Sequence, residues 1–345
     1  MPTKVVCQTF FILSRERLRR HTRGKKMASS IRTSFLRPAT NQSPTVSVRD
    51  AIIVAFLPIQ FLISWCAPER LWPLIGRLLQ PLTAYLYAKG ARHAEQVIAA
   101  TAGRQLDAGL IRNIPRQLAL EEFIMMLQIL RDYRPGGWRP TITLIGRQYL
   151  DLALKEGNGA ILWVTYTNGA RLIAKMAIQR GGYLVSHLSR PRHGLSSTKF
   201  GIKFLNWIQT TIEKRYVAER IVVEDREFQK AVRSLIARLR ANKVISITVH
   251  RYATRPSAVP FLDGQIVLAD GACRLSYITG AALLPVVAYR DGHDALKVEI
   301  GAPINTRQAT TETTSVVAAH REYVARLEGF VLAYPDQWRG WFQLS

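Results

Sequence analysis

From about residue 115 to the C-terminus, short apolar segments alternate with segments of helical spacing. Apolar runs typical of buried strands lie at 160–165, 183–187, 221–223, 244–249, 282–289 and 296–300. Between and after them, helical spacing predicts helices at 198–207, 228–239, 268–278 and 313–334. This alternation predicts a layered α/β domain, whose ligands bind at the carboxyl ends of the strands.

An uncharged apolar run precedes this domain. It covers Ala51–Cys66 and reads AIIVAFLPIQFLISWC, with Pro58 and Gln60 inside it. The run is shorter than the roughly 20 residues that span a bilayer. A second helical stripe follows, formed by Leu71, Leu74, Ile75, Leu78, Leu79 and Leu82. We predict a pair of interfacial helices that dips into one leaflet; two buried core helices are the alternative.

Residues 1–50 differ from the rest of the chain in charge. They carry eleven Lys and Arg against only Glu16 and Asp50. We predict a disordered basic arm at 1–50 that lies against anionic lipid, membrane-associating helices at 51–114 and the α/β domain at 115–345. An organelle transit peptide, or a true start at Met27, would explain the same basic segment.

The formal charge of +24 over 345 residues favours partners that carry negative charge. Nucleic acid, anionic lipid and acyl-carrier substrates all fit this charge, but no nucleic-acid-binding module is recognisable. The three cysteines, Cys7, Cys66 and Cys273, are widely separated and have no metal-ligand spacing. We therefore expect no disulfide framework and no metal. No familiar nucleotide-binding or catalytic motif is recognisable either, and we expect no cofactor.

Histidines and arginines gather after the predicted strands. His187, His193 and His250 lie near strand ends, where a histidine can act as a general base, although a structural role is the simpler explanation. Nearby arginines suit phosphate and carboxylate oxygens; the set predicted to bind an anion or lipid head group is Arg190, Arg192, His193, Arg251 and Arg255. The paired acids Glu121 and Glu122 are assigned to a helix terminus or a solvated face.

Four local features resemble the lipid A biosynthesis (late) acyltransferases of Gram-negative bacteria. They are the strand 159–165, the strand and loop 244–261, the segment GAALLPVVAYR at 280–290 and the closing YPDQW at 334–338. The resemblance implies a lysophospholipid acyltransferase-like fold, with a mixed central sheet, helices on both faces and apolar helices before it. It also implies transfer of a fatty acyl chain from acyl carrier protein or coenzyme A to a glycolipid hydroxyl.

The sequence departs from that family at its His-x4-Asp/Glu motif. Tyr166 occupies the position of the histidine and Arg171 that of the acid. Tyrosine, with a pKa of about 10, is a poor base at neutral pH, and arginine cannot orient a histidine as a carboxylate does. An active enzyme would need a base from another strand end, and His187 and His250 are the candidates.

Two interpretations therefore compete. In the first, the protein is an acyltransferase at the cytoplasmic face of the bacterial inner membrane, peripheral or shallowly inserted. In the second, it is a catalytically inactive relative that binds lipid or acyl carrier. A basic nucleic-acid-binding protein is a third interpretation, which leaves the apolar run at 51–66 unexplained.

Overall fold

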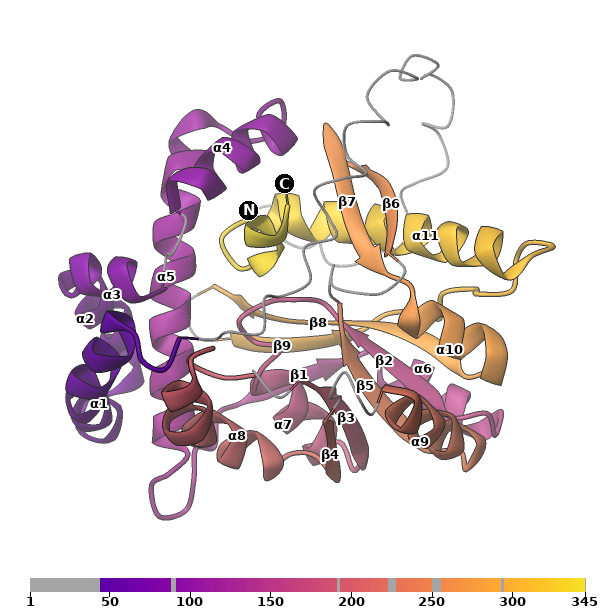
Figure 1. Cartoon of the computed structure of the whole chain (residues 1–345), viewed down its shortest axis with the longest axis horizontal. Helices are drawn as coiled ribbons and strands as arrows, with labels where there is room; N and C mark the ends of the chain where they lie inside the picture. The colour runs from indigo at the N-terminus through magenta and orange to yellow at the C-terminus, as the bar shows by residue number, and fades with distance from the viewer. Residues whose placement is uncertain are drawn as a thin grey trace, which may run out of the picture.

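A seven-stranded sheet lies at the centre of the computed structural model, which describes residues 44–87, 91–190, 193–222, 228–249, 256–292 and 295–344 (Figure 1). The strands, in spatial order, are β1 (Ile142–Ile145), β9 (Ala295–Ile300), β8 (Ala282–Asp291), β2 (Ala160–Val164), β5 (Val244–Thr248), β3 (Val185–Ser189) and β4 (Glu219–Val222). The strands from β8 to β4 are parallel, whereas β9 runs antiparallel to β8. The prediction of an α/β domain around a mixed sheet is confirmed.

Helices cover both faces of the sheet. Side chains of β2 alternate between the two faces: Ile161 and Trp163 pack with one set of helices, and Leu162 and Val164 with the other. The first set is α9 (Phe228–Arg240), α10 (Gly271–Thr279) and α11 (Glu312–Ala333). The second is α6 (Arg147–Lys155), α7 (Ile173–Arg180) and α8 (Asn206–Lys214). Burial on both faces explains why β2 is a continuous apolar run.

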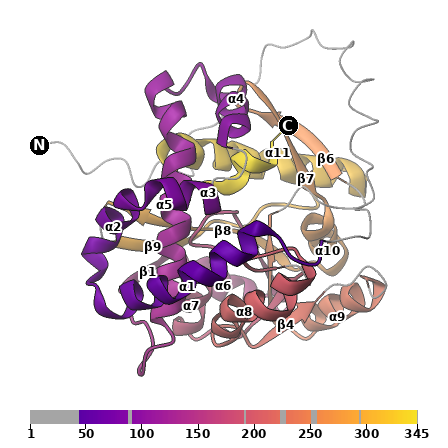
Figure 2. The ribbon, with the colours of Figure 1, turned by 60° about the vertical axis from the view of Figure 1, so that its left-hand side comes forward.

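The long helix α5 (Ala108–Arg131) joins the sheet to the N-terminal helices. One side of α5 contributes Met125 and Ile129 to the core beneath the sheet, and another side contributes Phe123 and Leu127 to a separate core. That second core includes residues of α1 (Val48–Cys66), α2 (Trp72–Leu78) and α3 (Gln80–Tyr87), and α4 (Ala91–Ala102) packs nearer the start of α5 (Figure 2). The boundary predicted at residue 115 falls inside α5, and the division into domains stays a prediction.

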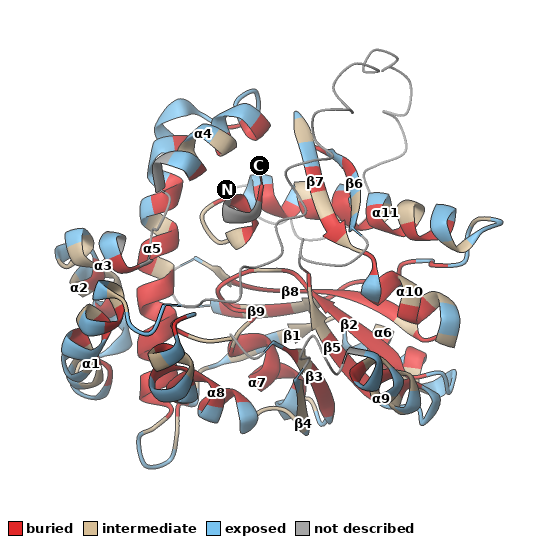
Figure 3. Cartoon of the chain, in the orientation of Figure 1, coloured by how far each residue is buried: buried red, intermediate tan, exposed pale blue. Residues whose placement is uncertain are grey.

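Helix α1 buries three polar residues beside two apolar ones and leaves several large apolar side chains exposed. The buried positions are Asp50, Ile53, Phe56, Gln60 and Ser64, of which three are polar. By contrast, several large apolar side chains of α1 and the following helices are exposed: Val54, Ile59, Leu62, Trp65, Leu71, Leu74, Leu78 and Tyr85. In Figure 3 exposed residues on these helices are coloured pale blue. The alternative of two buried core helices is therefore wrong for these residues.

Polar contacts fix both ends of α1 to the domain. At its start, Ser47 caps the helix, and Asp50 accepts a hydrogen bond of 2.8 Å from the Thr198 hydroxyl. At its end, Arg131 donates to the carbonyl groups of Trp65 and Ala67 at 3.0 and 2.9 Å. These carbonyl groups have no partner within the helix, so the guanidinium group caps α1. The helix is thus held in place with its apolar side outward.

Several elements differ from the sequence-based expectation. Strand β1, helix α6 and the hairpin of β6 (Pro256–Phe261) with β7 (Gly264–Ala269) were not predicted. The predicted helix at 268–278 begins only at Gly271, because residues 264–269 belong to β7. Residues 1–43, and with them almost all of the predicted basic arm, lie outside the described residues.

Candidate functional site

The carboxyl ends of β2, β3, β5 and β8 lie along one edge of the sheet, because these strands are parallel. The loop after β2 and most of the loop after β3 are described. His250, Arg251 and Arg255 after β5, and Arg192 after β3, lie outside the described residues, so their predicted roles stay predictions.

The loop after β2 carries the two residues at the family's motif positions. Its backbone is fixed against β8: the Thr167 hydroxyl donates to the Ala288 carbonyl at 2.6 Å, and a Cβ atom on Gly169 would lie 2.8 Å from that same oxygen. The Tyr166 ring is half-buried, and the Arg339 guanidinium group lies over it at 5.3 Å. Tyr166 is therefore packed against a cation.

Arg171 forms an ion pair with a buried carboxylate. Its Nη1 atom lies 2.6 Å from Oε1 of Glu122, which comes from α5, while Arg339 pairs with the other oxygen of Glu122. Arg339 also donates to Oδ1 of Asn168 at 2.8 Å, and its backbone N–H donates to the Tyr166 carbonyl at 2.9 Å. The position of the expected acid thus belongs to a three-residue ion cluster that joins α5, the loop after β2 and the C-terminal segment.

Burial shapes the electrostatics of this cluster. The side chains of Arg171, Glu122 and Arg339 are 13%, 9% and 15% exposed. Desolvation lowers the pKa of Arg339 to about 10, so the guanidinium group still carries its charge at neutral pH. Beside it, burial raises the pKa of Glu121 against the opposing charge of Arg290, 3.8 Å away. The assignment of Glu121 and Glu122 to a solvated face is wrong, because both pair with arginine.

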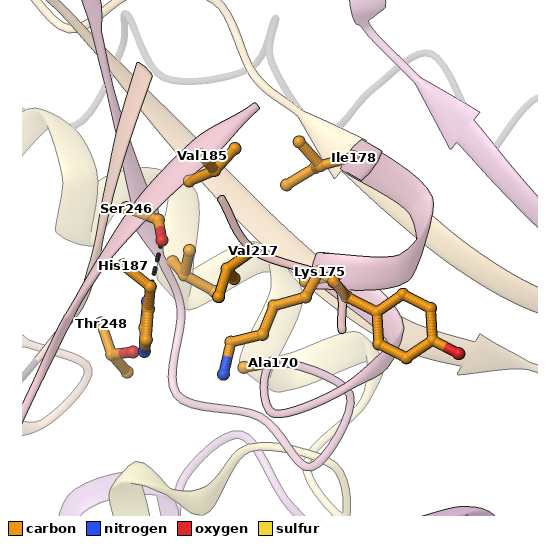
Figure 4. Close-up of a pocket in the computed structure, with 11 residues that line it drawn as sticks. Ala170, Lys175, Ile178, Val185, His187, Val217, Ser246 and Thr248 are labelled. Atoms are coloured by element: carbon orange, nitrogen blue, oxygen red, sulfur yellow. Dashed lines mark hydrogen bonds between the residues drawn. The ribbon is translucent and has the colours of Figure 1, made fainter. Parts of the chain in front are cut away.

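His187 lies inside the domain, at the middle of β3. It is 6% exposed, and its Nδ1 atom lies 2.8 Å from the hydroxyl of Ser246, its register partner on β5. Figure 4 shows Lys175 extending along the same pocket, whose free volume of about 10 Å³ has room for one water. Burial, and then the Lys175 charge, holds the pKa of His187 well below its usual range. A sugar or acyl chain does not fit around this imidazole.

His193 occupies a different setting, on the loop after β3. Its side chain is 28% exposed, and its Nε2 atom lies 2.9 and 3.0 Å from the two oxygens of Glu213. Glu213, on α8, is 2% exposed and also binds the Lys175 ammonium group at 2.5 Å. The loop after β3 therefore brings a partly exposed histidine to a buried carboxylate.

Sequence reasoning missed three residues of this edge: Glu122, Glu213 and Arg339. Glu213 and Glu122 look like ordinary helical acids in the sequence, because their partners are far away along the chain. Arg339 directly follows the YPDQW element and could have been included with it. The signal for the other two was a charged residue among apolar positions of a helix, as in LEEFIMML at 120–127.

The sequence is similar to one protein family over about two thirds of its length. The family model of the bacterial lipid A biosynthesis acyltransferases matches residues 118–344, from within α5 to the last described residue. A short segment of 58 residues is 41% identical to anhydro-N-acetylmuramic acid kinase of Agrobacterium fabrum (strain C58); it covers 17% of this chain and 16% of the kinase. That similarity spans about one sixth of the kinase. The family match covers every strand of the central sheet, and this chain belongs to the bacterial lipid A biosynthesis acyltransferase family.

Proposed function

We propose that the protein transfers a fatty acyl chain from an acyl thioester, carried by acyl carrier protein or coenzyme A, to a hydroxyl group of a glycolipid. The observation that carries this proposal is the family match over 118–344, which includes the whole sheet and the segment that closes the motif loop. In such a reaction the hydroxyl oxygen attacks the thioester carbonyl, and a general base removes its proton.

The N-terminal helices support a location at the membrane surface. Helix α1 is the one helix within the described ranges that is long and apolar enough to cross a membrane. Its buried side is rich in polar groups and its outward side is apolar, with Leu62 65% exposed and Leu78 of α2 75% exposed. Because soluble surfaces rarely present so many large apolar side chains together, we propose that this face enters the outer part of a bilayer.

The cytoplasmic face of the inner membrane is the location we propose. Acyl carrier protein and coenzyme A thioesters are cytoplasmic donors, and a glycolipid acceptor lies in the membrane. A chain with a net charge of +24 is attracted to anionic head groups. The arrangement we infer is peripheral or shallowly inserted, with α1–α3 in contact with lipid.

A catalytically inactive, lipid-binding relative is the second candidate function. It is favoured by the motif loop, where Tyr166 packs under Arg339 and Arg171 pairs with Glu122. Neither residue can take the proton of an attacking hydroxyl at neutral pH. This candidate predicts binding to lipid or acyl carrier without turnover.

One assay separates the two. Full-length protein is incubated with radiolabelled laurate, myristate or palmitate thioesters of acyl carrier protein or coenzyme A, and with bacterial glycolipid in vesicles. If the protein is an acyltransferase, we expect labelled glycolipid to form, and its formation should require both the protein and the acceptor. Vesicle binding without labelled product, from protein whose circular dichroism is that of an α/β fold, would instead support the inactive relative.

A further inference from the structure

We propose that His193 is the general base of this protein and that Glu213 of α8 positions it, so that the base lies on the loop after β3 instead of the loop after β2. This inference rests on the proposed acyl transfer. That reaction needs a base, and none stands at the motif position, where Tyr166 and Arg171 are held in other contacts.

The contact between His193 and Glu213 fixes the orientation of the imidazole. Both carboxylate oxygens lie within 3.0 Å of Nε2, and the side-chain amide nitrogen of Gln209 lies 3.2 Å from the same ring atom. Because an ionised carboxylate only accepts hydrogen bonds, we assign the proton of the neutral ring to Nε2, which donates to Glu213. The other ring nitrogen, Nδ1, then holds a lone pair. No group among the described residues forms a hydrogen bond with Nδ1, and the side chain is partly exposed, so a substrate hydroxyl can reach it.

The contacts of the Glu213 carboxylate favour its ionised form. Lys175 of α7 binds one of its oxygens at 2.5 Å, and the side-chain amide of Gln209 donates to the other at 2.5 Å. Burial raises the pKa of the Glu213 carboxyl, but the charge of Lys175 and the contact with His193 outweigh it and hold that pKa well below its usual range. A fixed negative charge behind the ring is what stabilises an imidazolium that has accepted a proton.

The surroundings of the dyad are positively charged. Besides Lys175, Arg220 of β4 faces Glu213, and it donates to the Arg190 carbonyl at 3.2 Å. The Nε atom of Arg220 is buried and has no hydrogen-bond partner in the described parts of the chain. His187 of β3 is a further titratable neighbour, and burial lowers its pKa and favours the neutral imidazole. Such a site suits an acceptor or donor that carries phosphate groups.

The two loops belong to one electrostatic unit. The charge of Arg171, after β2, acts on Lys175, and Lys175 binds Glu213, which binds His193. His187 touches the same unit, but it is 6% exposed against 28% for the His193 side chain. Among the histidines predicted from the sequence and placed by the structure, His193 alone combines a carboxylate partner with access from solvent.

The proposed acyl transfer uses only the two substrates and the imidazole of His193, and every proton and leaving group has a destination. Nδ1 of His193 takes the proton of the acceptor hydroxyl as its oxygen forms a bond to the thioester carbonyl carbon. The tetrahedral adduct collapses with cleavage of the C–S bond, and the imidazolium returns the proton to the leaving thiolate. The products are the ester and the free thiol, and His193 is neutral again.

The test compares His193→Ala and His193→Asn with His93→Ala in the full-length protein. His93 is exposed on α4 and serves as the matched control. We expect both His193 variants to lower kcat by about 100-fold or more, with KM nearly unchanged, and His93→Ala to keep wild-type rates. Added imidazole should restore part of the rate to His193→Ala, because it replaces the missing base.

Glu213 has its own readout as a positioning residue. The double variant Lys175→Met/Glu213→Gln removes the buried carboxylate together with the ammonium group that binds it, and its unfolding midpoint reports whether the fold survives. We expect this folded variant to lose kcat by about tenfold or more, with KM nearly unchanged, because the ring is no longer oriented. If the wild-type protein turns over and His193→Ala is equally active, this inference is overturned and the proposed function still holds. An inactive wild-type protein would overturn the proposed function, and this inference with it.

Discussion

Arg171 and Arg339 bind the two oxygens of the Glu122 carboxylate. Arg171 occupies the position at which the family motif has its acidic residue. The three side chains come from segments separated by 49 or more residues along the chain. Their contact holds the motif loop to α5 and to the C-terminal segment. This ion cluster is therefore a structural element of the edge, and neither of its arginines can act as a base at neutral pH.

Glu122→Gln tests that structural role. Removal of the carboxylate leaves two largely buried guanidinium groups without their counter-charge, so we expect the free energy of unfolding to fall by about 2–4 kcal/mol. Chemical denaturation measures it. Arg104→Gln is the control, because the Arg104 side chain is 86% exposed and its pair with Asp263 should contribute less than about 0.5 kcal/mol. Equal stability losses in the two variants would contradict the role of Glu122.

His187 predicts a dependence of stability on pH. In the unfolded chain an imidazole binds a proton below about pH 6.5, whereas burial depresses the pKa of His187 in the folded protein. The unfolded state therefore binds more protons, and the free energy of unfolding falls as the pH drops from 6.5 through the folded pKa, by up to about 1.4 kcal/mol per pH unit.

The variant His187→Gln should show a shallower decline between about pH 6.5 and 5, measured by denaturation at each pH. Some decline should remain, because burial also depresses the pKa of His320. Identical slopes for variant and wild type would mean that His187 is protonated in the folded protein.

Among single residues, the sequence identified His187, His193, Tyr166 and Arg171 as noteworthy but could not assign their partners. Hydrogen-bond partners such as Ser246 and Glu213 are 59 and 20 residues away from their histidines. Strand register and helix packing decide which of these pairs meet, and neither follows from local spacing. The sequence therefore could not show that His187 is buried whereas His193 is partly exposed.

At the scale of elements, α1 and α2 turn apolar side chains outward, and Arg131 and Asp50 hold α1 in that orientation. The apolar stripe found in the sequence at 71–82 is real, but part of it faces away from the core: Leu74 and Leu78 are 53% and 75% exposed. The spacing of apolar residues in the sequence identifies which face of a helix is apolar. It does not say whether that face packs on protein or on lipid.

Leu62→Glu combined with Leu78→Glu tests the proposed lipid contact. Both positions are exposed, so the free energy of unfolding should change by less than about 0.5 kcal/mol. Each leucine contributes roughly 1.5–3 kcal/mol when it enters an apolar phase, so vesicle affinity should fall by at least about tenfold. Vesicle co-sedimentation measures it.

Leu152→Glu is the matched control, since Leu152 is 55% exposed on α6, away from α1–α3. It should bind vesicles as the wild type does. A double variant that still binds with wild-type affinity would exclude α1 and α2 as the lipid-contacting face.

The elements that the sequence missed share a physical cause. Strand β1 has only four residues and none of them is buried, and β6 carries Pro256 and Pro260, which are unusual in strands. The hairpin turn holds Leu262 at φ 51°, where a long-range hydrogen bond from its backbone N–H to Glu328 fixes it. Edge strands and tertiary turns leave weak local signals, whereas buried β2 and β5 were plain in the sequence.

For the whole molecule, the net charge of +24 and the apolar N-terminal face both favour binding to an anionic membrane. Binding to vesicles rich in anionic lipid should weaken as salt rises, because salt screens head-group attraction, while the apolar contribution remains. We expect a steep salt dependence for anionic vesicles and a small one for neutral vesicles, measured by co-sedimentation. Tighter binding to bare nucleic acid than to anionic vesicles at physiological salt would instead support the nucleic-acid interpretation.

The most direct test of the account is the mass of the glycolipid acceptor after incubation with wild-type protein and a fatty acyl thioester. We predict that the recovered glycolipid gains one ester-linked acyl chain, and that the gain requires the protein and disappears in His193→Ala. An unchanged mass, with folded protein bound to the acceptor vesicles, would contradict the account and leave a family member that binds lipid without acylating it.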